Sequence, residues 1–324
     1  MKLGSAWLLF VALTCWGLMA IVFCNLPVGL RCSAAAAFGL AVLAGAVLQH
    51  SGRRKAAWFA AVFALALAWW FALSPSNTRD WRPDSATLPF AEIGGSSVTI
   101  RNIRDCDYRT EKDYTVRYYD RTFDLNSLRT MDLFLVDWGA PQIAHTMLSF
   151  GFGGGKYLCI SIETRRKKGE EYSSVRGFFK QYELIYIVAD ERDVIRLRTD
   201  YRTREYVYLY RLNATPELIR KVFLDYLQSM NRLKDRPQWY NALTANCTTD
   251  IWKHIVPYYP KARFDWRLIA SGHADEMAYD LGAVDRSLPF AELRRRSRIN
   301  ERSQAAGRGP DYSEIIRRGL PGFN

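Results

Sequence analysis

The sequence predicts an α+β domain, built from an antiparallel sheet and helices, that follows three transmembrane helices. The first 75 of the 324 residues contain no Asp or Glu and are largely apolar. The rest alternates short strand-like runs with amphipathic helical segments, a pattern typical of an α+β architecture. We therefore expect a membrane anchor over residues 1–75 and an outer domain over residues 76–324. The outer domain should have its core at about 125–275 and a basic C-terminal tail.

Three apolar runs fill the first 75 residues, and each is close to the ~20 residues that a helix needs to cross the hydrocarbon core. The second run is the weakest, because it is short and rich in Ala and Gly. The alternative is two spans with a buried hairpin, while a cleaved signal peptide would account for the first run alone. The predicted spans are Ala6–Leu26, Ser33–Gln49 and Ala56–Leu73.

Basic residues set the expected orientation of these spans. Arg53–Lys55 is the only basic cluster in the short loops, so this loop should be cytoplasmic. Three spans then place the N-terminus in the cytoplasm and the outer domain in the periplasm or outside the cell. Trp69 and Trp70 agree with this orientation, because they would be interfacial aromatics at the outer end of the third span. Arg31 does not agree with it, because it would be a basic residue in the outer loop.

Alternation of apolar and polar residues predicts the strands of the outer domain. Two such runs flank Gly153–Gly155, which predicts a β-hairpin over Ala144–Arg166. The charged stretch at residues 189–203 has no clear pattern, and we assign no element to it. The other predicted strands are Ser97–Ile103, Tyr114–Tyr119, Met131–Trp138, Tyr182–Val188 and Arg204–Tyr210.

Two helices are predicted after the strands. The first covers Thr215–Leu233, with Thr215 as its cap and Pro216 at its first position. The second begins near Cys247 and ends before Pro257, because the residue before a proline disfavours the α conformation. The basic, turn-rich tail from Arg294 should be mobile, and it either touches anionic lipid head groups or is simply solvated.

Cys247 is a candidate nucleophile because of where the second helix begins. Asn246 is a good N-cap residue and would place Cys247 at the first helical position, where the positive end of the helix dipole favours a thiolate. Three cysteines lie beyond residue 75, so at least one stays unpaired even if a disulfide forms. We expect Cys106 and Cys159 to be free. The alternative is that all three are small buried apolar residues.

The predicted hairpin supplies a candidate base. With the turn at Gly153–Gly155, His145 falls directly opposite Glu163, and opposed side chains share a face with Cβ atoms ~5 Å apart. Glu163 would then orient the imidazole, as in a catalytic triad. A surface His–Glu pair is the alternative, and a slip of one residue would separate the two. His254 lies two helical turns after Cys247, ~10 Å away, too far for a direct hydrogen bond.

These residues follow one another in the order of a known fold. A histidine at a strand start, a polar partner on the next strand and then NC at a helix start resemble the permuted papain-like, or NlpC-like, fold. More narrowly, the chain resembles the family of the Lnb N-terminal periplasmic domain. The stretches that carry this resemblance are AHTMLSFGF, SIETRRKKGEEYS, GFFKQYELIYIVADERDVIRLRT and YNALTANCTTDIW. They cover most of Asp132–Trp252, whereas the three spans and the tail lie outside.

The resemblance implies a thiol acyltransferase of the bacterial inner membrane. Cys247 would take an acyl chain as a thioester, His145 would act as the base and Glu163 would orient it. Backbone N–H groups at the helix start would stabilise the oxyanion. Asn246 and Thr248 are the candidates for additional support there.

The resemblance also implies the partners: a phospholipid as acyl donor, a lipoprotein or other acceptor, and the bilayer itself. Arg165 and Arg166 follow the hairpin and are candidates for binding a lipid head group. Neither a cofactor nor a metal site is expected, because the Cys and His residues lack zinc-ligand spacing. The chain carries a net charge of +12, but nucleic acid is not expected in this compartment. The alternatives are a cell-wall cysteine peptidase or amidase and a non-catalytic envelope scaffold.

Overall fold

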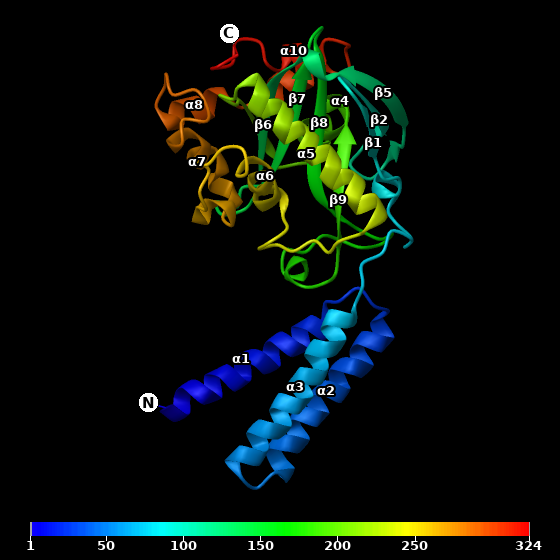
Figure 1. Ribbon diagram of the computed structural model, residues 1–324, viewed down its shortest axis with the longest axis vertical. Helices are drawn as coiled ribbons and strands as arrows, with labels where there is room; N and C mark the ends of the chain where they lie inside the picture. Colours follow the sequence, from blue (N-terminus) through cyan, green and yellow to red (C-terminus); the bar gives the residue numbers. More distant parts are fainter. Residues whose placement is uncertain (1, 324) are drawn as a thin grey trace. The chain divides into compact units, whose positions relative to one another are not determined.

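The computed structural model describes residues 2–323 and divides into two compact units (Figure 1). One unit comprises Met1–Asn77 together with Glu170–Glu183 and Gln238–Ala242. The other comprises Thr78–Gly169, Leu184–Pro237 and Leu243–Asn324. Two short segments that are distant in sequence therefore belong to the unit that contains the N-terminal helices.

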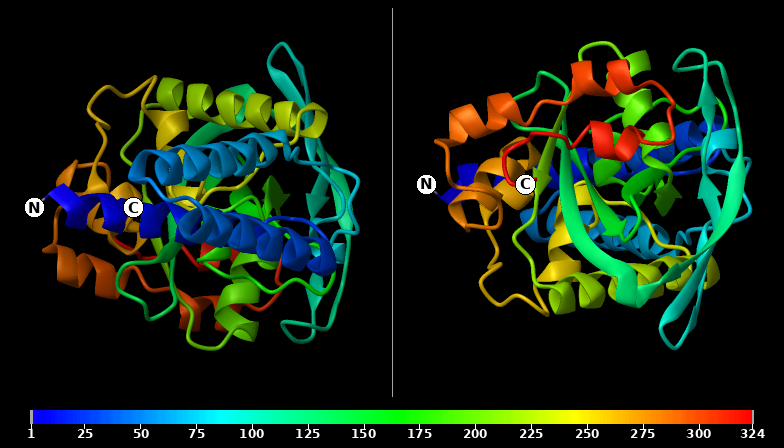
Figure 2. Two further views of the ribbon diagram at one scale, coloured as in Figure 1. Left: turned by 90° about the horizontal axis from the view of Figure 1, so that it is seen from below. Right: turned by 90° about the horizontal axis from the view of Figure 1, so that it is seen from above.

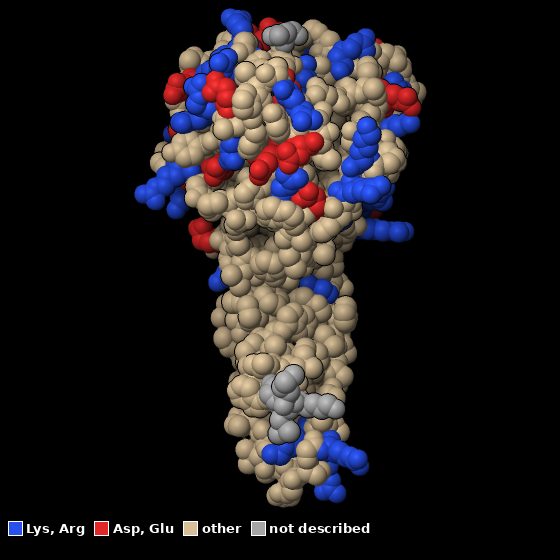
Figure 3. Space-filling view, turned by 90° about the vertical axis from the view of Figure 1, so that its left-hand side faces the viewer, with Lys and Arg blue, Asp and Glu red and all other residues tan. Residues whose placement is uncertain are grey.

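Three N-terminal helices are long and apolar enough to cross a membrane, as the sequence predicts. They are α1 (Lys2–Val22), α2 (Val28–Leu48) and α3 (Gly52–Ala72). Ile21, Phe38 and Val42 are buried where the helices pack together. On the face drawn in Figure 3, the middle of the helical surface shows no charged side chains, and the Lys and Arg side chains lie towards its ends. Such a surface suits hydrocarbon and would be costly to expose to water.

Hydrogen bonds join both additional segments of this unit to residues at or near the ends of the helices, and the second segment does so through Trp239, whose indole donates to the Leu73 carbonyl at 3.3 Å. The Asn25 side chain donates to the buried Glu183 carboxylate at 3.0 Å. Lys180 Nζ donates to the Trp70 carbonyl at 2.7 Å. Arg31, the charge that the orientation rule does not explain, donates to the last carbonyl of α1 at 2.9 Å. These contacts satisfy polar groups that the helix ends would otherwise leave unpaired.

An eight-stranded sheet forms the centre of the second unit, in the order β1-β2-β9-β8-β7-β6-β10, with β5 paired to β2. The pairings of β1 and β5 with β2, of β7 with β6 and β8, and of β6 with β10 are antiparallel, whereas that of β2 with β9 is parallel. The expected strand at 114–119 is split between a short ribbon and β5. The strands are β1 (Phe90–Gly94), β2 (Ser97–Arg104), β3 (Asp107–Tyr108), β4 (Tyr114–Thr115), β5 (Tyr118–Asp124), β6 (Leu128–Asp137), β7 (Ala144–Phe152), β8 (Lys156–Arg165), β9 (Glu183–Ala189) and β10 (Tyr206–Arg211).

Helices cover both faces of this sheet (Figure 2). Helices α5 (Pro216–Asp235) and α6 (Cys247–Ile255) lie on the face of β7 that carries Phe150, whose ring is 4.8 Å from that of Phe223 in α5. Helices α4 (Glu191–Arg196), α9 (Asn300–Ala306) and α10 (Tyr312–Ile315) lie on the face that carries Met147. We refer to the two faces of the sheet as the α6 face and the α4 face. Helices α7 (Ala274–Asp280) and α8 (Phe290–Arg296) lie between α6 and α9 in sequence.

The C-terminal tail is folded, which corrects the expectation that it is mobile. Its apolar residues Ile299, Tyr312 and Ile316 are buried in the core of the α4 face. The basic composition of the segment obscured this, because those apolar positions are separated by charged and turn-forming residues. The charged stretch at residues 189–203 likewise folds, into α4 and a π-helical turn over Leu197–Tyr201.

Candidate active site

Cys247 is the first residue of α6, as the sequence predicts. The Asn246 side chain accepts a hydrogen bond from the Thr249 N–H at 2.8 Å, and the Thr249 hydroxyl accepts one from the Asn246 N–H at 3.0 Å. This reciprocal capping box fixes where the helix starts. Cys247 is only 7% exposed, so its thiol is recessed at the positive end of the helix dipole.

The hairpin of β7 and β8 brings His145 and Glu163 together in the predicted register. Phe152 pairs with Lys156, and His145 Nε2 lies 3.7 Å from Glu163 Oε1. The Ser161 hydroxyl bridges the two, at 2.7 Å from His145 Nε2 and 2.8 Å from Glu163 Oε1. The imidazole is therefore oriented by a hydroxyl and a carboxylate on the neighbouring strand.

Arg198 stabilises the negative charge of Glu163. Its guanidinium donates to Glu163 Oε1 at 3.0 Å. Burial opposes ionisation of Glu163, but Arg198 and His145 outweigh burial and hold the pKa of the carboxyl well below its usual range. Burial, reinforced by Arg198 and opposed by Glu163, lowers the pKa of His145 to about 3. At neutral pH His145 is a neutral imidazole, the form that accepts a proton.

The thiol and the imidazole lie on opposite faces of β7. The Thr146 hydroxyl is 3.0 Å from that of Thr248, so Thr146 faces α6. Because successive residues of a strand point to opposite faces, His145 lies on the α4 face, where its partners also lie. Cys247 Sγ is 3.8 Å from the Thr248 hydroxyl. In the part of the chain that the structure describes, no hydrogen bond joins Cys247 to His145.

Arg165 is not available to a lipid head group, which corrects that prediction. It is 1% exposed and donates to the Ser85 and Ala86 carbonyls at 2.9 and 2.6 Å. Its guanidinium also lies 4.3 Å from the centroid of the Trp81 ring. The charge run after the hairpin suggested a solvated surface, but its first arginine is structural. Arg166 is partly buried, and burial lowers its pKa.

Two members of the cluster, Ser161 and Arg198, were not predicted. Ser161 could have been found, because it lies two residues before Glu163 and so shares its strand face. Arg198 could not, because its position depends on the π-helical turn after α4. Among the described residues, no group of three or more His, Cys, Asp or Glu side chains is arranged to hold a metal ion. Cys106 and Cys159 are buried free thiols, as expected.

A second buried histidine has a structural role. His254 Nδ1 is 2.7 Å from Asp225 Oδ2, and its Nε2 is 2.6 Å from the Tyr186 hydroxyl. These contacts join α6 to α5 and β9. Because His254 has two such partners and is two turns along α6 from Cys247, its hydrogen bonds account for its burial without a role in catalysis.

His145→Asn should make the protein less sensitive to acid. The folded pKa of His145 is about 3, compared with an ordinary value of 6.5, so the unfolded chain binds the proton more readily and stability falls as the pH drops below 6.5. As the pH falls from 7 to 5, this histidine should lower the free energy of unfolding of the wild type by about 2 kcal/mol. Pulse proteolysis in urea at both pH values measures the difference. His254 is present in both proteins, so its contribution to the pH dependence cancels in the comparison. An unchanged pH dependence of stability in the variant would contradict the prediction.

The family model described as the Lnb N-terminal periplasmic domain matches residues 114–272 of the chain. The matched segment contains Cys247, His145 and Glu163, and it ends before α7. Comparison with curated proteins found no match, and comparison with solved structures found none either.

Proposed function

Because residues 114–272 belong to the Lnb N-terminal periplasmic domain family, we propose that this membrane-anchored periplasmic protein is a cysteine acyltransferase. It moves an acyl chain from a phospholipid to an acceptor, such as a lipoprotein, through a thioester. The observation that carries the proposal is Cys247 at the first position of a capped helix, in a chain with three membrane-spanning helices. The chain is inserted in the inner membrane, and the basic loop at Arg53–Lys55 supports a cytoplasmic N-terminus.

The proposed reaction has two balanced steps. The Cys247 thiolate attacks the ester carbonyl carbon of the phospholipid, and the bond from this carbon to the glycerol oxygen breaks. The base passes the thiol proton to this oxygen, so lysophospholipid leaves. An acceptor amine then attacks the thioester, an amide forms, and the amine gives its proton back to the sulfur through the base. Backbone N–H groups at the start of α6 stabilise the oxyanion in both steps.

His145 is the base in this proposal, and its position imposes a requirement. Its link to Glu163 orients the ring, but with a pKa of about 3 the ring is a weak base, and it lies on the α4 face, whereas Cys247 is tied to the α6 face. The start of β7 therefore has to rearrange when substrate binds. Thr146 and Thr248 keep the two segments adjacent, so the movement is local.

An apolar rim near the start of β7 supports a lipid substrate. Ile143 is 39% exposed, Phe264 64%, Trp266 58% and Ile269 46%. The segment that carries the last three returns to β7 through the Ser271 hydroxyl, which donates to the Ala144 carbonyl at 2.7 Å. Large exposed apolar side chains are available to contact an apolar partner such as an acyl chain.

The intact mass of the full-length protein, incubated in detergent with phosphatidylethanolamine of defined acyl chains, tests the proposed function. We expect a fatty-acyl increment on the protein, its removal by hydroxylamine, and the release of lysophospholipid. If neither an increment nor lysophospholipid appears with any phospholipid, acyl transfer is wrong. Cleavage of cell-wall peptides by the same sample would then favour the peptidase alternative.

Phe264→Ser/Trp266→Ser should weaken the reaction with lipid without unfolding the protein. Both rings are largely exposed, so their loss removes apolar contact area for an acyl chain rather than core packing. We expect a fall of about 10-fold in lysophospholipid release at subsaturating lipid, equivalent to ~1.4 kcal/mol of lost contact. Ile93→Ser/Leu281→Ser, which alters two exposed residues elsewhere, is the matched control. An equal loss in the control pair would show that the rim has no specific role.

One observation favours a second candidate, a non-catalytic envelope scaffold. The cluster of His145, Ser161, Glu163 and Arg198 is closed by its own hydrogen bonds without Cys247. A scaffold would keep such a cluster for stability alone. His145→Gln separates the two functions, because it should abolish acylation of Cys247 in an enzyme and leave the binding of a partner intact in a scaffold.

A further inference from the structure

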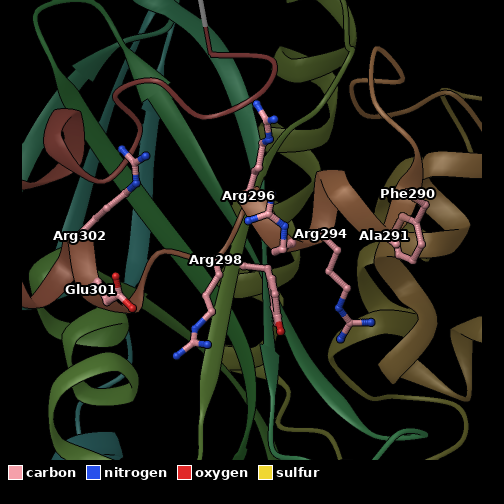
Figure 4. Close-up of a pocket in the computed structure, with 9 residues that line it drawn as sticks. Phe290, Ala291, Arg294, Arg296, Arg298, Glu301 and Arg302 are labelled. Carbon is pink, nitrogen blue, oxygen red and sulfur yellow. The ribbon is translucent and has the colours of Figure 1, made fainter.

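We propose that an arginine-lined cavity of about 750 Å³ at the β10 edge of the sheet binds a phosphate group. Figure 4 shows its lining, with arginine side chains from α8, from the segment that follows it and from α9. Apart from Tyr208, its lining residues lie beyond residue 272, outside the segment that matches the family. It is lined by Tyr208, Phe290, Ala291, Arg294, Arg295, Arg296, Arg298, Glu301 and Arg302.

The charge of this cavity is only partly balanced by the protein. Arg294 pairs with Asp137 and Asp275, Arg295 and Arg296 share the single carboxylate of Glu292, and Glu301 is the one acidic residue of the lining. Arg298 and Arg302 have no carboxylate partner within 4.0 Å among the residues that the structure describes. Five arginines around one cavity repel one another. A bound anion offsets this repulsion. Its binding free energy therefore includes a favourable electrostatic contribution that a neutral ligand lacks.

Two guanidinium groups of the cavity are held in place before any ligand binds. The Arg294 guanidinium lies 4.8 Å from the centroid of the Tyr208 ring, and that of Arg298 lies 4.5 Å from the centroid of the Tyr206 ring. Stacking fixes the plane of a guanidinium and reduces the entropy lost when it binds. All five basic residues are arginines, and the planar fork of arginine matches two oxygens of a phosphate. Lysine would supply charge without this geometry.

The sheet places the cavity near the thiol. Tyr208 pairs with Leu135 of β6, and Leu135 pairs with Thr146 of β7. Neighbouring strands are ~4.8 Å apart, so Tyr208 lies about 10 Å across the sheet from Thr146. Thr146 contacts Thr248, the neighbour of Cys247. A phosphate in the cavity is therefore close enough to belong to a molecule whose other end approaches Cys247, although binding itself does not depend on the proposed acyl transfer.

Calorimetric titration of the full-length protein in detergent tests the site. The probes are inorganic phosphate, dihexanoyl phosphatidic acid and, as the phosphate-free comparison, dihexanoylglycerol. Arg298→Gln/Arg302→Gln removes the two arginines without carboxylate partners. Arg129→Gln/Arg236→Gln, which alters two exposed arginines outside the cavity, is the control with the same loss of charge. We expect the cavity variant to bind at least about 10-fold more weakly and the control to bind as the wild type does.

The outcomes separate the source of the phosphate. Saturable binding of inorganic phosphate that the cavity variant loses supports a site for soluble phosphate or its esters. Binding of phosphatidic acid alone, lost in the same variant, supports a lipid head-group site. Equal weakening in the control pair, equal binding of dihexanoylglycerol, or the absence of binding by either phosphate probe overturns the proposal. None of these outcomes bears on thioester formation at Cys247, which is measured separately.

Discussion

Cys247→Ala should reduce lysophospholipid release by at least about 1,000-fold and abolish the hydroxylamine-sensitive acyl increment. Removal of a nucleophile leaves only the residual rate from substrate binding and the oxyanion donors. Cys247 contacts Thr248 but makes no contact on which the start of α6 depends, since the helix is capped by Asn246 and Thr249. The variant should therefore fold normally. Intact mass and lysophospholipid release, measured on the same samples, check both parts of the prediction.

Cys32→Ser is the matched control, because this thiol is exposed and lies in α2. It should retain the acyl increment and the rate of the wild type. If Cys247→Ala keeps the acyl increment, the modified residue is elsewhere and thiol catalysis at α6 is wrong. If both variants lose activity, the loss is not specific to Cys247 and does not identify it as the nucleophile.

The elements that could be predicted from sequence are those fixed by neighbouring residues. Three consecutive glycines set the register of the hairpin, and the register alone brings His145 opposite Glu163. The start of α6 depends on Asn246 and Thr249, three residues apart. Such signals lie within one turn or one strand pair, so a single sequence contains them.

The features that could not be predicted depend on contacts between distant parts of the chain. Arg198 reaches Glu163 only because α4 is followed by a π-helical turn. Arg165 is buried because residues 85 and 86 pass over it. The position of Cys247 relative to His145 also depends on which face of the sheet α6 covers, and neither the hairpin nor the cap determines this.

A buried ion cluster joins the charged stretch to the basic tail, in addition to the apolar residues that both bury in the core of the α4 face. Arg317 donates to Asp132 at 2.8 Å and to Glu191 at 2.6 Å, and all three side chains are buried. Asp132 belongs to β6, Glu191 to α4, and Arg317 to the segment after α10. Burial opposes the charge of Arg317, but the carboxylates of Glu191 and Asp132 outweigh burial and raise its pKa. One arginine thus joins the tail, α4 and the sheet.

Arg317→Met should therefore destabilise the outer unit by about 3–5 kcal/mol. Methionine fills similar space, so the cost arises mainly from Glu191, which keeps only the Ser149 hydroxyl, and less from Asp132, which keeps Arg211. The guanidinium also lies 3.6 Å from the centroid of the Tyr157 ring, a contact that methionine keeps only in part. Pulse proteolysis of the full-length protein across a urea series measures the change in the unfolding midpoint.

Arg318→Met is the control for this measurement, since Arg318 is the next residue and is exposed. Its replacement removes the same charge with the same change of side chain, and the free energy of unfolding should change by less than about 0.5 kcal/mol. Equal effects of the two substitutions would mean that net charge, and not the buried cluster, stabilises the tail. If only Arg317→Met lowers the midpoint, the basic tail is part of the folded unit, and the arginine-lined cavity that it forms with β10 has a fixed framework.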